Sequence, residues 1–313
     1  MLMYLVRRIL STIPVVVVVG ILVFLMLRLT PGDPASVIAG NSATDQEVAE
    51  IRHKLGLDQP ILTQFFIWSG QMLTGNFGES FFYKKSVGSL IADRIEPTLS
   101  LAFFTIVLAV LISVPLGTWA AYRQGSWIDR IVIGFSVMGF SVPVFVIGYV
   151  LIYVFAVRLG WFPTQGYQRL AEGVGGYLYR LVLPSLTLAV VYVALLARMT
   201  RTSVLEVLNE DYVRTARAKG LPPLKVLMRH ALRNAAVPIV TVIGIGIALL
   251  IGGVVVTESV FNIPGLGRLT VDAVLARDFP TVQTVVLLFS IAYVLINLVI
   301  DLLYMVLDPR IRY

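Results

Sequence analysis

The stretch N-A-A-V-P-I-V-T-V-I-G-I-G-I-A-L-L-I-G-G-V-V-V-T at 234–257 decides the class of fold. It runs for 24 residues without a charged side chain. Because roughly 20 apolar residues in a helix span the hydrocarbon core of a bilayer, this stretch predicts a transmembrane helix. Composition extends the conclusion to the whole chain of 313 residues: 58% are hydrophobic, only 14% are charged, and the mean hydropathy is +0.86.

Five other windows share the apolar, uncharged character of this stretch. They cover residues 9–27, 97–122, 131–157, 181–197 and 279–300. The window at 181–197 is short for a span, and we expect its helix to continue past Arg198, whose long side chain can reach the interface. Together the six windows predict an all-α polytopic membrane protein with six transmembrane helices.

A seventh uncharged window, 59–78, is too polar to be a span because it contains glutamine, asparagine and glycine. Its apolar residues recur at helical spacing and form one face: Ile61, Phe65, Trp68 and Met72. This pattern predicts a helix that does not cross the membrane. Two placements remain open, one in the membrane interface and one packed on the protein.

The distribution of charge predicts the orientation of the six spans. With the N-terminus in the cytoplasm, the inside segments are 1–8, 123–130, 198–233 and 301–313; they hold 14 basic and 6 acidic residues. The outside segments hold 11 basic and 12 acidic residues. Because Lys and Arg concentrate in cytoplasmic loops, both termini are predicted to be cytoplasmic. The chain then divides into an N-terminal anchor helix (1–30), a periplasmic helical loop (31–96) and a five-helix core (97–313).

The outer loop carries its own helix signals. Thr-Pro-Gly-Asp-Pro at 30–34 is expected to stop the first span. Thr44 and Glu47 form a capping-box pattern, and Gly56 closes the helix that follows. His53 lies in this helix, where we interpret it as a surface residue.

The largest inside segment, 198–233, is predicted to contain a short, sharply bounded helix. Asn209 is the expected N-cap, and acidic Glu210 and Asp211 suit the first turn. Gly220 can adopt the left-handed conformation that ends a helix, and the prolines at 222–223 prevent its continuation. Such a helix is a rigid object to which a soluble partner can bind. The alternative is a solvated basic connector beside anionic lipid headgroups.

Signatures of catalysis are missing from the sequence. There is no cysteine, no G-x-x-x-x-G-K-[ST] motif and no H-E-x-x-H or G-x-S-x-G motif, and the two histidines do not suffice for a metal site. We therefore expect a non-catalytic chain that binds neither metal nor nucleotide. The six windows also lack acidic and basic residues, which argues against an ion-coupled carrier. Ser136, Ser141 and Pro143 are candidates for a polar route, although helix packing and tolerated kinks are the more common explanation for such residues.

Motifs along the whole chain resemble one known family. They are Y-L-V-R-R-I-L at 4–10, L-R-L-T-P-G-D-P at 27–34, L-G-L-D-Q-P at 55–60, G-N-F-G-E-S at 75–80, L-G-W-F-P-T at 159–164, E-D-Y-V-R-T-A-R-A-K-G at 210–220, P-G-L-G-R-L at 264–269 and D-L-L-Y-M-V-L-D-P-R-I at 301–311. In this order and spacing the chain resembles the membrane permease subunits of bacterial ABC importers, in the dipeptide, oligopeptide and nickel permease family. Within it, the dipeptide- and glutathione-type permeases are the most similar.

The resemblance implies a type I ABC importer permease fold in the bacterial inner membrane. It implies a second homologous permease subunit, two ATPase subunits that hold ATP and magnesium, and a periplasmic or lipid-anchored substrate-binding protein; the lipid bilayer is the other partner, and nucleic acid is not one. It also makes 198–233 a coupling loop that docks on the ATPase. The implied coupling residues are Glu210, Asp211, Tyr212, Arg214, Thr215, Ala216, Arg217, Ala218, Lys219, Gly220 and Leu221.

In the family that the chain resembles, the coupling loop is called the EAA loop after a Glu-Ala-Ala motif. This sequence has Arg214, Thr215 and Ala216 at that place, as peptide-type permeases do, so the implied docking role is unchanged. Ala216 is expected to let the helix approach the ATPase because it is small.

The expected function is to form half of the translocation path for di- or oligopeptides in an ATP-driven, binding-protein-dependent importer. Glutathione and a nickel chelate are alternative substrates for the same role. A secondary carrier or channel that works alone, and a non-transporting membrane anchor or assembly factor, are the competing classes.

Overall fold

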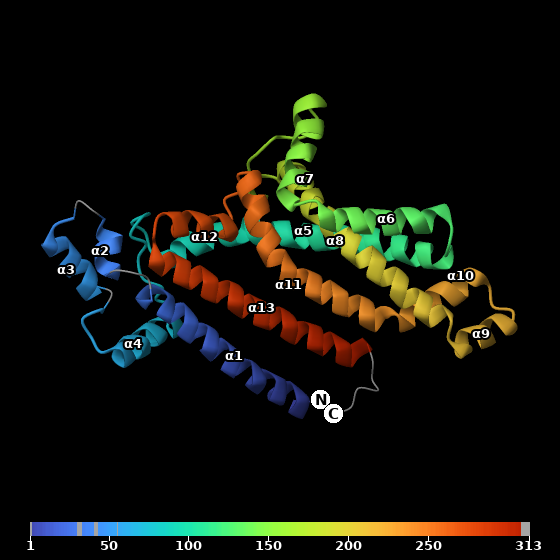
Figure 1. Cartoon of the computed structure of the whole chain (residues 1–313), viewed down its shortest axis with the longest axis horizontal. Helices are drawn as coiled ribbons and strands as arrows, with labels where there is room; N and C mark the ends of the chain where they lie inside the picture. Colours follow the sequence, from blue (N-terminus) through green and yellow to red (C-terminus); the bar gives the residue numbers. More distant parts are fainter. Residues whose placement is uncertain (1, 30–32, 41–42, 55, 308–313) are drawn as a thin grey trace. The chain divides into compact units, whose positions relative to one another are not determined.

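The chain is built almost entirely from helices (Figure 1). The computed structural model describes residues 2–29, 33–40, 43–54 and 56–307, and within these ranges there is no β-strand. An isolated antiparallel bridge joins Glu79 and Ser86. The all-α prediction is therefore confirmed.

The helices, in chain order, have the following bounds. The N-terminal part contains α1 (Leu2–Arg28), α2 (Pro34–Ala39), α3 (Asp45–Lys54), α4 (Ile61–Leu73) and α5 (Val87–Tyr122). The middle part contains α6 (Trp127–Ser141), α7 (Val144–Leu151), η1 (Ile152–Arg158), η2 (Leu170–Glu172), α8 (Val174–Leu208) and α9 (Asp211–Ala218). The C-terminal part contains α10 (Pro223–Lys225), η3 (Val226–Leu232), α11 (Ala236–Val260), α12 (Leu266–Leu275) and α13 (Phe279–Leu307).

Five helices in the described residues are long and apolar enough to cross a membrane. The spanning segments are Leu10–Arg28, Val87–Tyr122, Val174–Leu208, Ala236–Val260 and Phe279–Leu303. A sixth is obtained if α6 and the α7–η1 helix count as one span. The helix expected at 181–197 is α8, which does continue past Arg198, as far as Leu208.

The predicted span at 131–157 is not one straight helix. Its two halves, Trp127–Gly139 and Val144–Arg158, are bent by 108° relative to each other. Val142 and Pro143 are both extended at the break, with ψ of 122° and 140°. Proline lacks the N–H that would continue the helix, and it disfavours helical geometry in the residue before it. The predicted span is therefore broken by a sharp bend at this point, which the uncharged window by itself does not indicate.

By contacts, the chain divides into two compact units: Met1–Glu96 with Gly265–Leu295, and Pro97–Pro264 with Ile296–Tyr313. Helices α5 and α13 each contribute to both units. The division into 1–30, 31–96 and 97–313 stays a prediction.

In the first unit, α1 is linked to α13 and α4. The side-chain amide of Gln283 donates to the carbonyl oxygen of Val23 at 2.9 Å, and Arg28 Nε donates to Gln64 Oε1 at 2.9 Å. Trp68 lies against Phe24, with ring centroids 5.7 Å apart. With 13 residues, α4 is too short to span a bilayer, as predicted.

Helix α4 also leaves apolar side chains uncovered on the side away from α1. Leu62, Phe66 and Leu73 are exposed, and no residue of this helix is buried. The placement is therefore that of a helix packed along one edge on α1, and its free apolar face still suits a membrane interface.

The outer-loop helices form by the expected local signals. Thr44 and Glu47 make the predicted capping box: the Thr44 N–H donates to Glu47 Oε2 at 2.8 Å, and the Glu47 N–H donates to Thr44 Oγ1 at 3.3 Å. The Thr44 N–H and the Thr44 hydroxyl both donate to the Glu47 carboxylate, and these two bonds hold the pKa of Glu47 below its usual range. Gly56 follows with a φ of 63°. Helix α1 ends at Arg28; of the motif expected to stop it, residues 30–32 lie outside the described residues.

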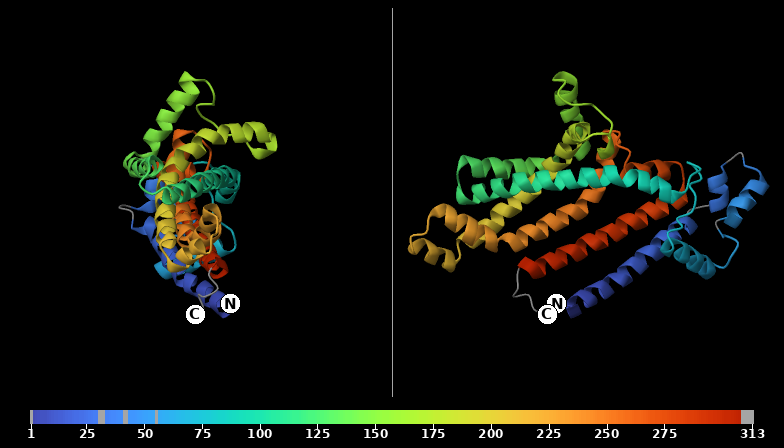
Figure 2. Two further views of the ribbon diagram at one scale, coloured as in Figure 1. Left: turned by 90° about the vertical axis from the view of Figure 1, so that its right-hand side faces the viewer. Right: turned by 180° about the vertical axis from the view of Figure 1, so that it is seen from behind.

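The second unit is organised around α8, whose spanning window is 67% buried. Its main core joins α8 to α5, α11 and the segment after α11. Its most buried large side chains are Leu101, Leu183, Leu188, Phe261 and Ile263. Helices α5 and α6 form a hairpin beside α8 (Figures 1 and 2). A second core lies at the end of α8 that leads into α9.

Candidate coupling surface

The segment after α8 contains the short helix that the sequence predicts. Helix α9 spans Asp211–Ala218. Its N-cap is Glu210, with extended backbone, and not Asn209 as predicted. The reason is that α8 runs on to Leu208, so Asn209 becomes the C-cap of α8 with near-helical angles. With this N-cap, Asp211 lies in the first turn and Arg217 in the last turn. The negative charge at the N-terminus and the positive charge at the C-terminus both interact favourably with the helix dipole.

Helix α9 ends where Gly220 reverses the chain. Gly220 has a φ of 75°, its N–H donates to the Arg217 carbonyl at 2.9 Å, and the Leu221 N–H reaches the Ala216 carbonyl at 3.4 Å. Pro222 and Pro223 follow and begin α10. The predicted left-handed glycine stop is therefore confirmed.

One face of α9 is packed into the chain itself. Val213 is fully buried and Ala216 is 6% exposed. Both belong to the second core, where they lie with Val204 and Leu208 of α8 and with Val226 of η3. This differs from the expectation that Ala216 faces a partner: its small size lets α9 approach its own chain. The helix is consequently fixed to the end of α8.

The other face of α9 is polar and open. The exposed residues of 210–220 are Glu210, Asp211, Tyr212, Arg214, Thr215, Arg217, Ala218, Lys219 and Gly220; Leu221 is half-buried. Arg214 Nη1 donates to Asp211 Oδ1 at 3.2 Å along the helix. Desolvation and the negative charge of Glu210 raise the pKa of Tyr212. The predicted coupling residues thus form one exposed surface, except for Ala216 and Leu221.

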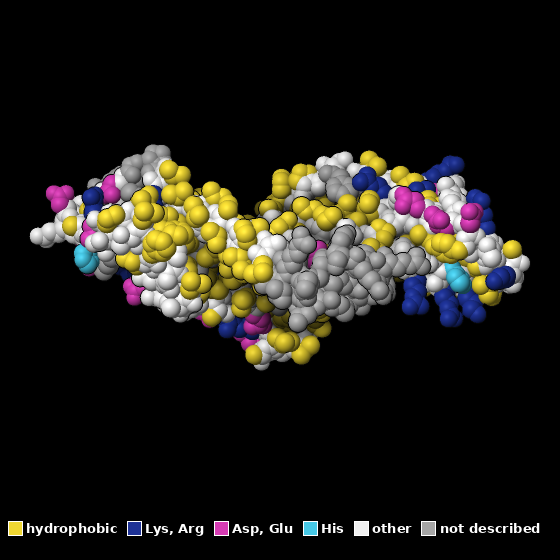
Figure 3. Space-filling view, turned by 90° about the horizontal axis from the view of Figure 1, so that it is seen from below, with side chains coloured by type: hydrophobic (Ala, Val, Ile, Leu, Met, Phe, Trp, Pro, Cys, Tyr) yellow, Lys and Arg dark blue, Asp and Glu magenta, His cyan; other side chains and the backbone are white. Residues whose placement is uncertain are grey.

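Basic side chains extend this surface beyond α9. Three exposed basic residues follow at a spacing of four, on α10, on η3 and just after η3: Lys225, Arg229 and Arg233. Figure 3 shows Lys and Arg side chains gathered at the α9–α10 end of the chain. The segment Val226–Leu232 is a π-helix, a rare conformation that recurs at functional sites.

The candidate path residues lie in different environments. Ser136 is fully buried and donates to the Val132 carbonyl at 2.8 Å. Ser141 is exposed and donates to the Val137 carbonyl at 3.1 Å. Pro143 is exposed at the break between α6 and α7. The burial of Ser136 favours a packing role, whereas Ser141 and Pro143 are accessible at the bend.

Two buried carboxylates of the second unit's described residues were missed by sequence reasoning. Asp129, near the start of α6, pairs with Arg201 of α8. Glu258, at the end of α11, is fully buried and accepts a 2.6 Å hydrogen bond from Thr98 Oγ1. Ser126 and Asp129 carry a cap pattern that the sequence shows, but only the fold brings Arg201 to it. Glu258 directly follows the uncharged window at 234–257 and so escaped the search for intramembrane charges.

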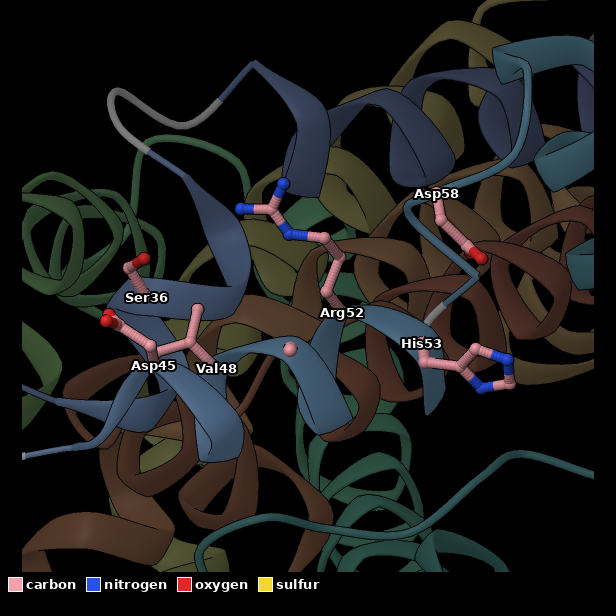
Figure 4. A pocket seen from close by; sticks show the side chains of 7 residues that line it. Ser36, Asp45, Val48, Arg52, His53 and Asp58 are labelled. Atoms are coloured by element: carbon pink, nitrogen blue, oxygen red, sulfur yellow. The ribbon is translucent and has the colours of Figure 1, made fainter.

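A shallow depression of about 520 Å³ lies between α2 and α3 in the outer loop (Figure 4). It is lined by Ser36, Asp45, Val48, Ala49, Arg52, His53 and Asp58. Arg52 is ion-paired with Asp33 at 2.8 Å. Hydrogen bonds from Ser36, followed by the interaction with Arg52, hold the pKa of Asp33 below its usual range. His53 is exposed, as predicted, and the described residues contain no cluster of acidic and histidine ligands able to hold a metal ion.

Comparison with known proteins establishes the class. Residues 113–313 match the sequence family described as the inner membrane component of binding-protein-dependent transport systems, and residues 1–102 match the family of its N-terminal region. The chain belongs to this family. It is a permease subunit of a binding-protein-dependent ABC importer, a multi-pass protein of the inner membrane that works with other components of such a transporter.

Particular relatives cover the whole chain. A probable peptide ABC transporter permease, y4tP, of Sinorhizobium fredii is 55% identical over 99% of both chains. The glutathione transport system permease GsiC is 46% identical in Salmonella typhi and 45% in Escherichia coli K12, over the full length of each.

Solved structures share the fold at low identity. A chain of the MetNI methionine ABC transporter, in an inward-facing conformation, matches with a TM-score of 0.57 and 20% identity, covering 70% of this chain and 96% of that one. A chain of an amino acid ABC transporter crystallised with histidines matches with a TM-score of 0.52 and 16% identity, covering 69% and 93%. The predicted type I importer permease fold is therefore confirmed.

Proposed function

We propose that this chain forms half of the translocation path of an importer for di- or oligopeptides, with a second, homologous permease as the other half. The observation that carries the proposal is the two-sided packing of α9. Val213 and Ala216 fix the helix to the end of α8, while its polar face stays open. Helix α9 is firmly packed on its own chain on one face and exposed to a partner on the other. Such a helix can transmit a movement of the partner to the transmembrane helices.

The partner of this open face is an ATPase subunit. ATP and magnesium bind there, so the free energy of hydrolysis must cross an interface to reach the spans. Arg214 and Arg217 are exposed and positively charged, and they suit acidic residues on the ATPase. Each exposed pair contributes only about 0–1 kcal/mol, so the shape of the α9 end, set by Gly220, carries most of the fit.

Orientation follows from this assignment. The ATPases are cytoplasmic, so α9 and both termini lie on the cytoplasmic side, in agreement with the excess of basic over acidic residues in the inside segments. The outer loop 31–96 then faces the periplasm, where a soluble or lipid-anchored binding protein delivers the substrate. Ser141 and Pro143, exposed at the helix break, are the favoured path-lining residues.

Peptides are the proposed substrate because the relative described as a probable peptide permease is more similar to this chain than the glutathione permeases are, at 55% against 46% identity. Glutathione, itself a small peptide, is the second candidate. A direct test is uptake into proteoliposomes. The tagged chain is purified from its native cells with its bound subunits, which mass spectrometry identifies, and the assembly is reconstituted with the binding protein.

Labelled dipeptide and labelled glutathione are then supplied separately, with and without ATP. ATP-dependent uptake of dipeptide, in an assembly that contains a second permease and ATPases, is the expected result. Preferential uptake of glutathione would replace the substrate and keep the role. An assembly with two copies of this chain and no second permease would refute the proposed heterodimer, and ATP-independent uptake by the chain alone would refute the importer assignment.

A further inference from the structure

The ion pair between Asp129 and Arg201 is bonded at both ends within the second unit's described residues. Arg201 donates to Asp129 with two nitrogens, Nε to Oδ1 and Nη2 to Oδ2, the latter at 2.8 Å. The Gly125 N–H donates to Oδ2 at 2.8 Å as well. The side chain of Asp129 is only 4% exposed and that of Arg201 17%. A two-pronged arginine–carboxylate contact fixes both distance and orientation.

This pair connects the turn of the α5–α6 hairpin to α8. Gly125 lies in the turn between α5 and α6, and Ser126 caps α6 by accepting from the Asp129 N–H at 3.5 Å. Asp129 is therefore fixed by the turn on one side and held by α8 on the other.

Small residues continue the contact along the helices. A Cβ atom on Gly117 of α5 would lie 2.5 Å from the Ala197 carbonyl oxygen and 2.8 Å from Thr200 Cβ. Ala120 of α5, Val132 of α6 and Ala197 of α8 form a buried cluster. Such residues let helices approach closely in a membrane. The hairpin is thus packed tightly on α8 next to the ion pair.

The same helix, α8, carries α9 at its end. Leu208 is the last residue of α8, and the rise of about 1.5 Å per residue puts Arg201 roughly 10 Å from it along the axis. In this last part of α8, Val204 and Leu208 belong to the same buried core as Val213 and Ala216 of α9. A displacement of α9 therefore reaches Arg201 through one short, packed helix segment.

Stability alone is a poor explanation for an ion pair in this position. Removing two charges from water costs about as much as their attraction returns, and well-packed apolar residues often replace such pairs without loss. What an apolar contact does not supply is a fixed orientation, because it permits sliding. The α5–α6 hairpin ends at the break around Val142 and Pro143, so a displacement of α6 can be taken up there.

We propose that Asp129 and Arg201 are a positioning pair that makes the α5–α6 hairpin follow the movement of α9, so that the ATPase moves α6 as well as α8. The inference rests on the proposed function of α9. The ion pair remains formed throughout the transport cycle and acts as a rigid connection between α6 and α8.

The test uses the complete reconstituted assembly and two readouts: stimulation of ATP hydrolysis by loaded binding protein, and uptake of labelled dipeptide. Asp129→Asn keeps an oxygen for the Gly125 N–H but removes the charge, and Arg201→Gln removes the two-pronged donor. In both variants we expect the ratio of uptake to ATP hydrolysed to fall about tenfold, the size of a typical coupling between sites. Asp272→Asn is the matched control, since Asp272 makes a looser 3.8 Å pair with Arg268 at the surface.

Replacing the ion pair with a covalent link distinguishes a rigid connection between α6 and α8 from a contact that only stabilises the fold. This chain has no cysteine, so Asp129→Cys with Arg201→Cys can be joined by a short bifunctional thiol reagent without reaction at any other site of the chain. The joined variant should recover most of the lost uptake per ATP, and the unjoined one should not. This comparison also decides the matter if the single variants fold poorly.

Each outcome bears on the inference. Wild-type ratios in Asp129→Asn and Arg201→Gln, or a joined variant that binds ATPase but stays uncoupled, would overturn it. If the wild-type assembly itself shows no stimulation of ATP hydrolysis by loaded binding protein, the proposed function fails first, and the two failures are thereby distinguished.

Discussion

Gly139 of α6 lies directly against Ala194 of α8: a Cβ atom built on Gly139 would be 2.5 Å from the Cβ of Ala194. At that separation only glycine fits without displacing one of the helices. Gly134, one and a half turns earlier on α6, has no atom within 4 Å of its Cβ position. Both glycines lie in α6, so a comparison of the two positions isolates the effect of the contact with α8.

The pair of glycines gives the first prediction. Gly139→Ala should destabilise the chain by about 1–3 kcal/mol, because the added methyl group overpacks the α6–α8 contact. Gly134→Ala should be neutral or stabilise by roughly 0.5–1 kcal/mol through the lower backbone entropy of alanine. Thermal unfolding of the purified assembly measures both, and equal melting temperatures would contradict the packing seen at Gly139.

The second prediction concerns the end of α9. Gly220 has a φ of 75° and open space around its Cβ position, so a substitution there tests backbone strain alone. Gly220→Val should cost about 1–2 kcal/mol or more in this conformation and greatly reduce uptake by reshaping the end of the coupling helix. Labelled dipeptide uptake and retention of the ATPases during purification are the measurements.

Gly75 provides the matched control for Gly220. It has a φ of 77°, nothing within 4 Å of its Cβ position, and a place in the outer loop after α4. Gly75→Val therefore carries the same backbone strain away from α9. We expect it to insert and transport nearly normally; a defect equal to that of Gly220→Val would mean that strain, and not the coupling helix, limits transport.

The third prediction contrasts the two faces of α9. Ala216→Trp places a large ring in the core shared with α8 and η3, so it should lower the melting temperature as well as uptake. Thr215→Trp adds the same ring on the exposed face. It should leave stability unchanged while weakening ATPase association about tenfold, which is roughly 1.4 kcal/mol, by holding the two surfaces apart.

Thermal unfolding and co-purification of the ATPases separate these effects. If Thr215→Trp binds ATPase as strongly as the unmodified chain, the exposed face of α9 is not a docking surface, and segment 198–233 is a connector.

The fourth prediction concerns orientation. Because the chain lacks cysteine, single cysteines introduced at Asp58 and Lys219 can be labelled specifically. Both residues are exposed. In spheroplasts, a membrane-impermeant maleimide should label Asp58→Cys and spare Lys219→Cys until the membrane is permeabilised. The same accessibility at both positions would exclude the proposed topology.

Several features follow from the sequence alone because their physics is local. A bilayer requires about 20 apolar residues in each helical span, so windows without charge reveal the spans with no knowledge of the fold. Likewise, the capping box at Thr44 and the left-handed stop at Gly220 depend only on residues within one or two turns. The short helix within 198–233 was therefore predictable as a bounded helix between two uncharged spans.

The remaining features depend on residues distant in sequence. Asp129 and Arg201 are 72 residues apart, and only the packing of the α5–α6 hairpin on α8 makes them partners. Similarly, Ala216 was expected to face a partner, but its burial is decided by Val204 and Val226 on neighbouring segments. Helical periodicity identifies the faces of a helix without identifying what covers each face; that is decided by tertiary packing, in which small differences in fit between distant residues select one arrangement.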